Sequence, residues 1–152
     1  DQLTTLAVQA VLVSIAVDQT DAEAVRQVEA LWRSVGCHTD RMTPEEHDTV
    51  FAAVSHLPHL LAFALAAQIA ADPDAARKFA LAGAGFRDFT RIAASSPALW
   101  SDVCVANRDA LSDELRQHRS LLAELQQAID ECDREALQGV FSRAGESLRA
   151  LG

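Results

Sequence analysis

The feature that most constrains the fold of this chain is a helix-forming run that begins at Thr43. Thr43 is a typical N-cap, Pro44 suits the first helical position, and Glu46 stands at the capping-box position. Apolar residues then recur up to Asp72, and in the second half of the run they cover almost the whole circumference. Because such a helix is usually central to its fold, the sequence predicts a mainly α-helical protein built around residues 43–71.

Polar residues interrupt this apolar run at two places. His47 and Asp48 lie near its start, and His56 and His59 flank Pro58 inside it. A proline within a helix removes one backbone hydrogen bond and forces a kink, so a free carbonyl is expected beside the two histidines. Polar groups in apolar surroundings must be paired or used. The kink therefore predicts a site.

The histidines have more than one interpretation. His56 and His59 are one helical turn apart, and His47 or Asp48 lies on roughly the same side of the helix, which would suit a metal ion. Core histidines bonded to backbone carbonyls are commoner than metal ligands, so no metal site is expected. The helix dipole is a sufficient reason for Asp48, but it does not favour a cation at His47.

A strand–helix–strand unit is predicted at the start of the chain. Residues 11–17 form a β-branched run, apolar residues from Val25 to Val35 follow helical spacing, and Gly36 ends that pattern. Residues 37–42 are expected to form a second short strand. The unit is too small to form a sheet of its own.

Several further helices are predicted after the central one. Their expected ranges are 75–81, 86–94 after a turn at 83–85, a long helix from Pro97 through Ile129, and 134–151.

Arg91 and Trp100 are candidate site residues in this second half. Arg91 follows a partly apolar stretch, so its guanidinium is expected against a packed wall, where it can clamp a carboxylate through two parallel hydrogen bonds. The alternative is an ion pair with Asp88, three residues earlier. Trp100 would either wall a site or fill the core, and by frequency the core is the commoner place.

Composition excludes several classes of protein. The 152 residues suit one domain, or a core with a remnant of a neighbouring domain. The net charge of −9, without a Lys/Arg cluster, argues against nucleic-acid binding. Three widely spaced cysteines without a CxxC motif indicate free thiols and a cytoplasmic protein. No stretch approaches the ~18 uninterrupted apolar residues of a membrane span, so no membrane partner is expected.

The ends and loops of the sequence lack several known signals. Residues 6–17 imitate the apolar part of a signal peptide, but no basic region or cleavage site accompanies them, and the first residue suggests a chain that begins within a longer protein. Neither a glycine-rich dinucleotide loop nor a phosphate-binding loop nor a nucleophile elbow is present. The glycines at 83 and 85 follow a helix, not a strand.

A set of motifs between about residue 11 and at least residue 112 recurs in one known family. The motifs are residues 28–32 with Gly36, 42–48, 54–59, 62–65, 83–93, 96–97, Trp100 and 107–108. Together they resemble the C-terminal part of the prephenate/arogenate dehydrogenases of tyrosine biosynthesis.

This resemblance implies an enzyme of two parts. Residues 1–42 would be the strand–helix–strand tail of a Rossmann-type NAD(P)-binding domain, and residues 43–152 an all-helical domain that forms a homodimer and binds substrate. The glycine-rich loop and the family's catalytic histidine would lie outside this chain. No catalytic or cofactor-binding residue is therefore expected here, and the chain alone is expected to be inactive.

The resemblance also implies the reaction and its ligands. The family oxidises and decarboxylates prephenate to 4-hydroxyphenylpyruvate, or arogenate in its place, with NAD or NADP as cofactor and tyrosine as a candidate inhibitor. The substrate is a dianion, so a site without water needs cationic donors. The alternative is a non-catalytic helical interaction or regulatory module, in which the polar residues are structural and Arg91→Ala affects stability alone.

Site residues follow from the same resemblance. Arg91 would clamp a substrate carboxylate, and Asp88 would hold Arg91 in its rotamer. The other residues expected to line the substrate pocket are Ser55, His59, Gly83, Ala84, Gly85 and Trp100. The residues expected to support the site are Asp88, His47, Asp48 and His56, with His56 structural and bonded across the helical core.

Overall fold

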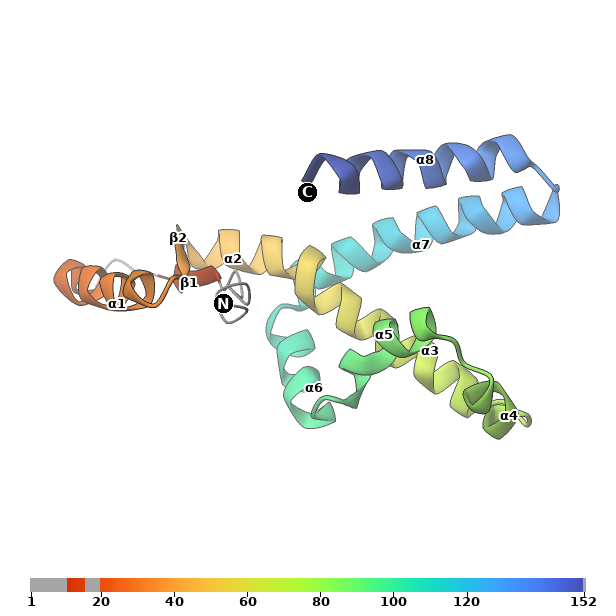
Figure 1. The fold of residues 1–152 in the computed structure, drawn as a ribbon, viewed down its shortest axis with the longest axis horizontal. Coiled ribbons are helices and arrows are strands. Elements are labelled where there is room, and N and C mark those ends of the chain that lie inside the picture. Colours follow the sequence, from red (N-terminus) through yellow and green to blue (C-terminus); the bar gives the residue numbers. More distant parts are fainter. Residues whose placement is uncertain (1–10, 16–19, 152) are drawn as a thin grey trace, which may run out of the picture. The chain divides into compact units, whose positions relative to one another are not determined.

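The structure, a computed structural model, describes residues 11–15 and 20–151 (Figure 1). Its elements in chain order are β1 (Val11–Ile15), α1 (Ala22–Ser34), β2 (His38–Met42), α2 (Pro44–Phe51), the π-helical turn η1 (Ala52–His56), α3 (Leu57–Ala70), α4 (Ala75–Ala80), α5 (Ala84–Thr90), the 3₁₀ turn η2 (Arg91–Ala94), α6 (Pro97–Ala106), α7 (Arg108–Asp130) and α8 (Arg134–Leu151). The expected fold class, mainly α with a short N-terminal β-α-β unit, is confirmed. The chain divides into two compact units, 1–107 and 108–152.

The N-terminal strands form a two-stranded parallel sheet, although the sequence predicted that this unit is too small for a sheet of its own. Val11 lies opposite His38 and Ile15 opposite Met42, and α1 is the crossover between the strands. Gly36 follows α1 with a φ of 89°, a left-handed conformation that glycine adopts without strain. The predicted first strand extended to residue 17, and residues 16–19 lie outside the described part of the chain.

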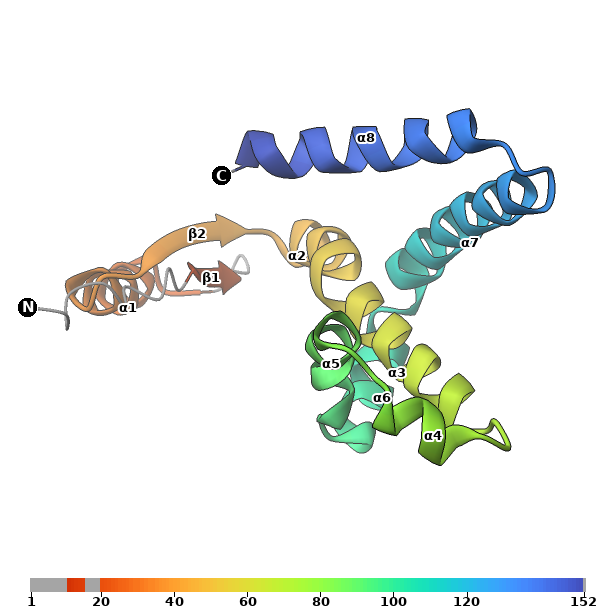
Figure 2. The same cartoon turned by 45° about the vertical axis from the view of Figure 1, so that its right-hand side comes forward.

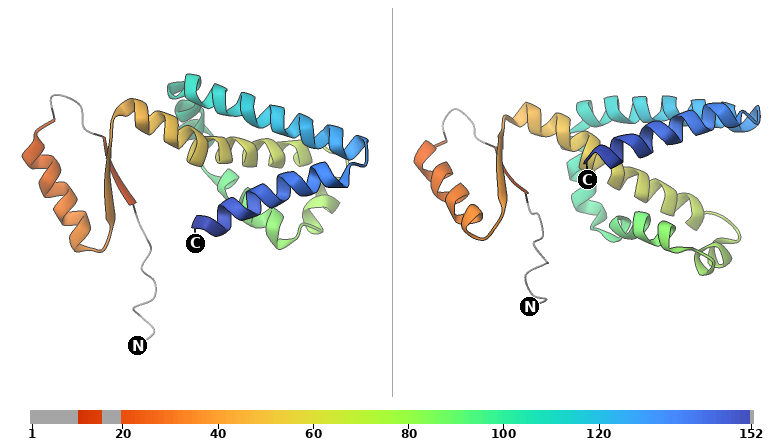
Figure 3. Two further views of the ribbon diagram at one scale, coloured as in Figure 1. Left: turned by 90° about the horizontal axis from the view of Figure 1, so that it is seen from above. Right: turned by 45° about the horizontal axis from the view of Figure 1, so that its top comes forward.

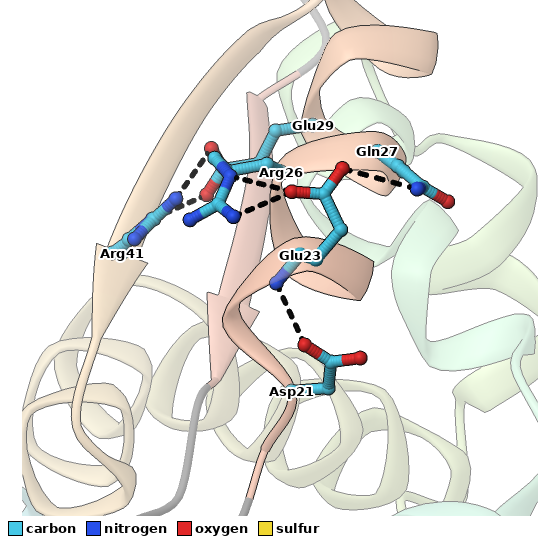
Figure 4. Close-up of polar contacts among 6 residues, drawn as sticks. All are labelled: Asp21, Glu23, Arg26, Gln27, Glu29 and Arg41. Carbon is cyan, nitrogen blue, oxygen red and sulfur yellow. Dashed lines mark hydrogen bonds and ion pairs between the residues drawn. The ribbon is translucent and has the colours of Figure 1, made fainter.

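An ion pair between a buried carboxylate and an exposed arginine joins α1 to β2 (Figure 4). The side chain of Glu29 is 3% exposed, and Arg41 donates to it twice, from Nε to Oε1 at 2.5 Å and from Nη2 to Oε2 at 2.9 Å. Arg33 adds a third hydrogen bond at 3.2 Å. The hydrogen bond from Arg41 holds the pKa of Glu29 below its usual range, although burial acts in the opposite direction. The carboxylate therefore stays charged and joined to the strand.

The central helix is continuous from Pro44 to Ala70 and contains α2, η1 and α3. Thr43 closes a capping box with Glu46, as the sequence predicted. The disturbance expected at Pro58 is present as the π-helical turn just before it, where the N–H of Leu57 bonds to the carbonyl of Ala52. Figure 1 shows α3 leaving the line of α2 at this turn.

The helices that follow gather along α3 (Figure 2). The segment predicted as one helix over 86–94 is instead the α-helix α5 followed by the 3₁₀ turn η2. The predicted single long helix from Pro97 to Ile129 is wrong, because Asn107 interrupts it with a φ of −105° and a ψ of 37°. The side chain of Asn107 is used in the site described below, and that bonding accounts for the break.

The second unit contains α7 and α8, which run back along each other as a helical hairpin (Figure 3). Cys132, with a φ of 56°, reverses the chain, and the N–H of Asp133 bonds to the carbonyl of Ala128 at 2.8 Å. Large apolar side chains remain exposed on both helices of this hairpin. They include Leu122, Ile129, Phe141 and Leu148.

The apolar surface of the central helix is partly covered. In its most apolar 18-residue window the mean hydropathy is 1.7, and 22% of the window is buried. By length and composition this helix could cross a membrane, although its sequence contains no uninterrupted apolar run long enough for a span. Ala52, Leu57 and Ala62 are its buried apolar residues, and most of its other large apolar side chains are half-buried. Val50 and Val54 are its exposed large apolar side chains.

Candidate functional site

Three polar residues lie in or just after the π-helical turn η1 of the central helix. Ser55 and His56 are its last two residues, and His59 follows in the first turn of α3. The wider turn arises where Pro58, which has no N–H, enters the helix. Such turns leave backbone carbonyls open to other donors. Nδ1 of His59 lies 2.9 Å from the carbonyl of Ser55, and since a carbonyl can only accept, this nitrogen donates.

His59 also stacks on Trp100 of α6. Their ring centroids are 3.6 Å apart and their planes 18° apart. His56 meets the same indole edge-on, with centroids 6.2 Å apart and planes at 71°. Because Nδ1 of His59 is engaged by Ser55, Nε2 is the nitrogen left for a ligand. The geometry offers one free imidazole nitrogen against an aromatic wall.

His56 is buried, and its partner comes from far along the chain. Nδ2 of Asn107 donates to the carbonyl of Asp48 at 2.7 Å and lies 3.1 Å from Nδ1 of His56. Burial lowers the pKa of His56, repulsion from His47 and His59 adds to this, and Asp48 partly offsets it. His56 is therefore a neutral group bonded across the helices. This is the structural role that the sequence predicted for it.

His47 and Asp48 lie on α2, before the π-helical turn. The ring of His47 stacks on Phe51 with centroids 4.4 Å apart, and its Nδ1 lies 3.1 Å from Oδ1 of Asp48. The backbone carbonyl of Asp48 is the group that receives Asn107. This pair thus supports the network from α2.

The glycine turn at 83–85 is exposed and begins α5. Gly83 is the N-cap of α5, and a Cβ added at Gly83 or Gly85 would meet nothing within 4 Å. The backbone of this turn is therefore open to close approach by a ligand. Arg87 holds the turn, because its Nε and Nη2 donate to the carbonyl of Ala82 at 3.1 and 2.7 Å.

Arg91 is exposed at the start of η2. In the described part of the chain neither Arg91 nor Asp88 forms a side-chain hydrogen bond or ion pair, so the expected pairing of the two residues is not present. Asp88 lies near the end of α5 and Arg91 begins the 3₁₀ turn η2, so the helical geometry changes between the two residues. The guanidinium is free to meet an anion.

An apolar cavity of about 320 Å³ lies between α3 and α6. Trp100 is the residue that it shares with the expected site. Its lining consists of Leu60, Phe63, Pro97, Trp100, Ser101 and Cys104.

The structure brings some of the expected residues together and leaves others apart. Ser55, His56, His59 and Trp100 form one connected cluster, and Asp48 joins it through Asn107. Gly83, Ala84, Gly85, Asp88 and Arg91 lie on α5 and its ends and form no polar bond to that cluster among residues 20–151.

The central member of the cluster, Asn107, was not among the site residues expected from the sequence. Its amide bonds two groups on the central helix. One signal was available, since Asn107 is the chain's single asparagine and falls in an otherwise helical stretch. Nothing in the spacing indicated its partners. Among the described residues no group of three or more His, Cys, Asp or Glu side chains is arranged to hold a metal ion.

Comparisons with known proteins agree on one family. Residues 43–143 match the family described as "Prephenate dehydrogenase, dimerization domain". The chain is 35% identical over 129 residues to the prephenate dehydrogenase of Bacillus subtilis, covering 83% of this chain and 34% of that protein. It is 33% identical over 134 residues to the cyclohexadienyl dehydrogenase of Zymomonas mobilis, covering 87% and 46%. The chain thus spans about a third to a half of the length of these curated relatives.

Solved structures give the same picture. The prephenate dehydrogenase of A. aeolicus, in complex with hydroxyphenyl propionate and NAD+, superposes with a TM-score of 0.76 at 31% identity, covering 91% of this chain and 49% of that one. Synechocystis arogenate dehydrogenase also gives a TM-score of 0.76, at 25% identity, covering 92% and 51%.

Proposed function

The chain belongs to the family of prephenate dehydrogenase dimerization domains, and from that premise we propose that it is the C-terminal portion of a prephenate or arogenate dehydrogenase. The proposed reaction is the NAD(P)-dependent oxidative decarboxylation of prephenate to 4-hydroxyphenylpyruvate in tyrosine biosynthesis. The names of the relatives support it, since they are prephenate, cyclohexadienyl and arogenate dehydrogenases. We place the domain boundary at residues 42 and 43, where the family match begins.

The observation that carries the proposal is the polar cluster on the central helix, within the segment that the family covers. The free Nε2 of His59 lies beside the face of Trp100, and buried His56 is held neutral behind it. A buried polar cluster costs stability unless it is fully bonded, so a bonded cluster with one nitrogen left over is suited to binding. We assign His59, Trp100 and Ser55 to the substrate pocket.

The substrate dianion requires cationic donors, and Arg91 is the proposed one. Its guanidinium is exposed and unpaired among the described residues, and it follows directly on α5. We assign the open backbone at Gly83, Ala84 and Gly85 to the same pocket. In the reaction, hydride leaves the ring carbon that carries the hydroxyl, the bond to the ring carboxylate breaks, and carbon dioxide departs as the ring becomes aromatic. Arg91 binds and orients a carboxylate in this scheme.

The nicotinamide cofactor, NAD or NADP, accepts the hydride when it is bound. The residues of this chain do not form its phosphate cradle, because the link from β1 to α1, residues 16–21, contains no glycine. We therefore assign cofactor binding to a nucleotide-binding part outside this sequence. The β1-α1-β2 unit is the proposed end of that part.

We further propose that the active form is a cytoplasmic homodimer. Two sets of exposed apolar side chains support it, Val50 and Val54 on the central helix and those of the α7–α8 hairpin. A second copy of the chain would cover them, consistent with the description of the family as a dimerization domain. Tyrosine, which resembles the product, is the proposed inhibitor.

Sedimentation with a ligand titration tests both parts of the proposal. The 152-residue chain should sediment at twice its 16.4 kDa mass and bind prephenate or hydroxyphenyl propionate. Arg91→Ala should remain dimeric and lose the ligand, whereas Phe141→Glu should sediment as a monomer. Glu146→Gln, a polar change on the same helix, is the matched control and should change neither. A chain that is monomeric and does not bind either ligand would contradict the proposal and favour a non-catalytic helical module.

A further inference from the structure

Asn107 breaks a helix to reach a distant part of the chain. It lies between α6 and α7 with non-helical dihedral angles, and it is only 7% exposed. A helix interruption and a buried amide both cost stability, so the contacts of this side chain must compensate for them. Those contacts are the carbonyl of Asp48 and the ring of His56.

We propose that Asn107 is a positioning residue of the substrate pocket: its side-chain amide holds His56 as the tautomer protonated on Nε2 and ties the end of α6 to the π-helical turn. This role in catalysis rests on the proposed function, whereas the tautomer of His56 does not. The family relationship assigns no role to this asparagine.

The direction of each hydrogen bond follows from the chemistry of the groups. The carbonyl of Asp48 can only accept, so the atom of Asn107 that faces it is the amide nitrogen. That nitrogen carries a second hydrogen, which points to Nδ1 of His56 at 3.1 Å. Nδ1 must then hold a lone pair, and the proton of the neutral ring is on Nε2. A protonated Nδ1 would place two donors against each other.

The same bonds set the aromatic wall of the pocket. Trp100 and Asn107 are seven residues apart, which puts both on one face of α6. His56 is bonded to Asn107 and lies edge-on to Trp100, and the face of Trp100 carries His59. Asn107 therefore fixes the position of α6 against the central helix, and through it the ring on which His59 lies.

Asn107→Asp is the sharpest substitution because it keeps the shape and removes the donor. A carboxylate can only accept, so it would accept a hydrogen bond from a protonated Nδ1 of His56 and repel the carbonyl of Asp48. The other charged or titratable groups that act on His56 are His47, Asp48 and His59. Of these only Asp48 favours the cation. The variant should therefore convert His56 to a ring protonated on Nδ1.

NMR of the chain labelled with ¹⁵N-histidine reads the tautomer directly. The chain has five histidines, so the spectrum can be assigned with single substitutions. Wild-type His56 should show a bare Nδ1 and a protonated Nε2, and Asn107→Asp should show a protonated Nδ1. Arg108→Ala, which removes a side chain bonded only to exposed Asp109, should leave the wild-type pattern. A wild-type His56 protonated on Nδ1 would overturn the inference.

A second measurement does not depend on the folding of Asn107→Asp. Because Asn107 is the single asparagine, ¹⁵N-asparagine labelling gives one side-chain amide signal. Both of its hydrogens should be protected from exchange, and His56→Gln should release one of them. Two freely exchanging hydrogens would contradict the proposed bonds.

Kinetics of the complete dehydrogenase that carries this chain tests the positioning role. Asn107→Asp should lower kcat/KM by about tenfold to a hundredfold, the size expected when a pocket wall shifts, while Arg108→Ala leaves it unchanged. Unchanged kcat/KM in a variant whose His56 has switched tautomer would overturn the positioning role. The inferred tautomer in a wild-type protein that turns over neither prephenate nor arogenate would instead refute the proposed function.

Discussion

The imidazole of His59 lies flat on the indole of Trp100, with ring centroids 3.6 Å apart and planes 18° apart. The bond from Nδ1 of His59 to the carbonyl of Ser55 prevents the ring from turning. The imidazole therefore stays against the face of the indole, with its Nε2 left for a ligand.

This stack predicts that His59 affects the fluorescence of Trp100. The chain has two tryptophans, so Trp32→Phe leaves Trp100 as the only tryptophan emitter. In this background His59→Gln should change the emission of Trp100, because it removes the ring that lies on the indole. The measurement compares the emission spectra of the two variants at the same pH. Identical spectra would contradict the stack.

Arg91→Ala should abolish ligand binding without destabilising the fold. The guanidinium forms no bond within the described residues, so the free energy of unfolding should change by no more than about 0.5 kcal/mol. Loss of its hydrogen bonds to a carboxylate should weaken prephenate binding by about 1.5–3 kcal/mol. Calorimetric titration and thermal unfolding measure the two effects.

Arg87→Ala is the matched control for Arg91. Arg87 lies four residues earlier, on α5, and donates to the carbonyl of Ala82. Its loss should loosen the turn at 83–85 and lower the melting temperature. If Arg87→Ala instead abolished binding with no change in melting, while Arg91→Ala had no effect, the assignment of the clamp would be wrong.

Buried His56 predicts a loss of stability in mild acid. Its pKa is lowered, chiefly by burial, so the unfolded chain takes up this proton at about pH 6.5 and the folded chain only at a lower pH. The contribution of His56 is therefore complete above about pH 6.5 and declines as the pH falls toward the folded value. Urea unfolding at a series of pH values measures it. His56→Gln should flatten the dependence, whereas His38→Gln, an exposed histidine, should leave it unchanged.

Glu29→Gln should separate α1 from β2. The substitution leaves Arg41 and Arg33 without their shared carboxylate, and a lowered melting temperature is expected. Because the pKa of Glu29 is lowered, the wild-type contribution is present at neutral pH and is lost as the pH falls below about 4.3, through the folded value. Glu23→Gln breaks an exposed pair on the same helix and should have a much smaller effect. Equal effects of the two variants would contradict the importance of burial.

The helices could be predicted from the sequence where capping signals and apolar spacing agree. Thr43 with Glu46 marked the start of the central helix, and Gly36 marked the end of α1. The break at Asn107 could not be predicted, because it depends on two partners more than fifty residues away. Local patterns carry no information about such long-range bonds.

The candidate site could likewise be predicted only where local sequence patterns determine the structure. The histidines beside Pro58 attracted attention because of their apolar surroundings, and the π-helical turn is the local result of that proline. Spacing could not show that His59 stacks on Trp100, nor that Arg91 and Asp88 stay apart. Both facts depend on how separate helices pack and on the change from α5 to η2.

A single residue, Thr43, joins β2 to the central helix, and the capping box with Glu46 fixes its backbone. Strand and helix therefore follow each other without a loop between them. The same helix carries Asp48, whose carbonyl receives Asn107. Any shift of the sheet edge relative to the pocket would have to be taken up at Thr43 or within the first turns of α2.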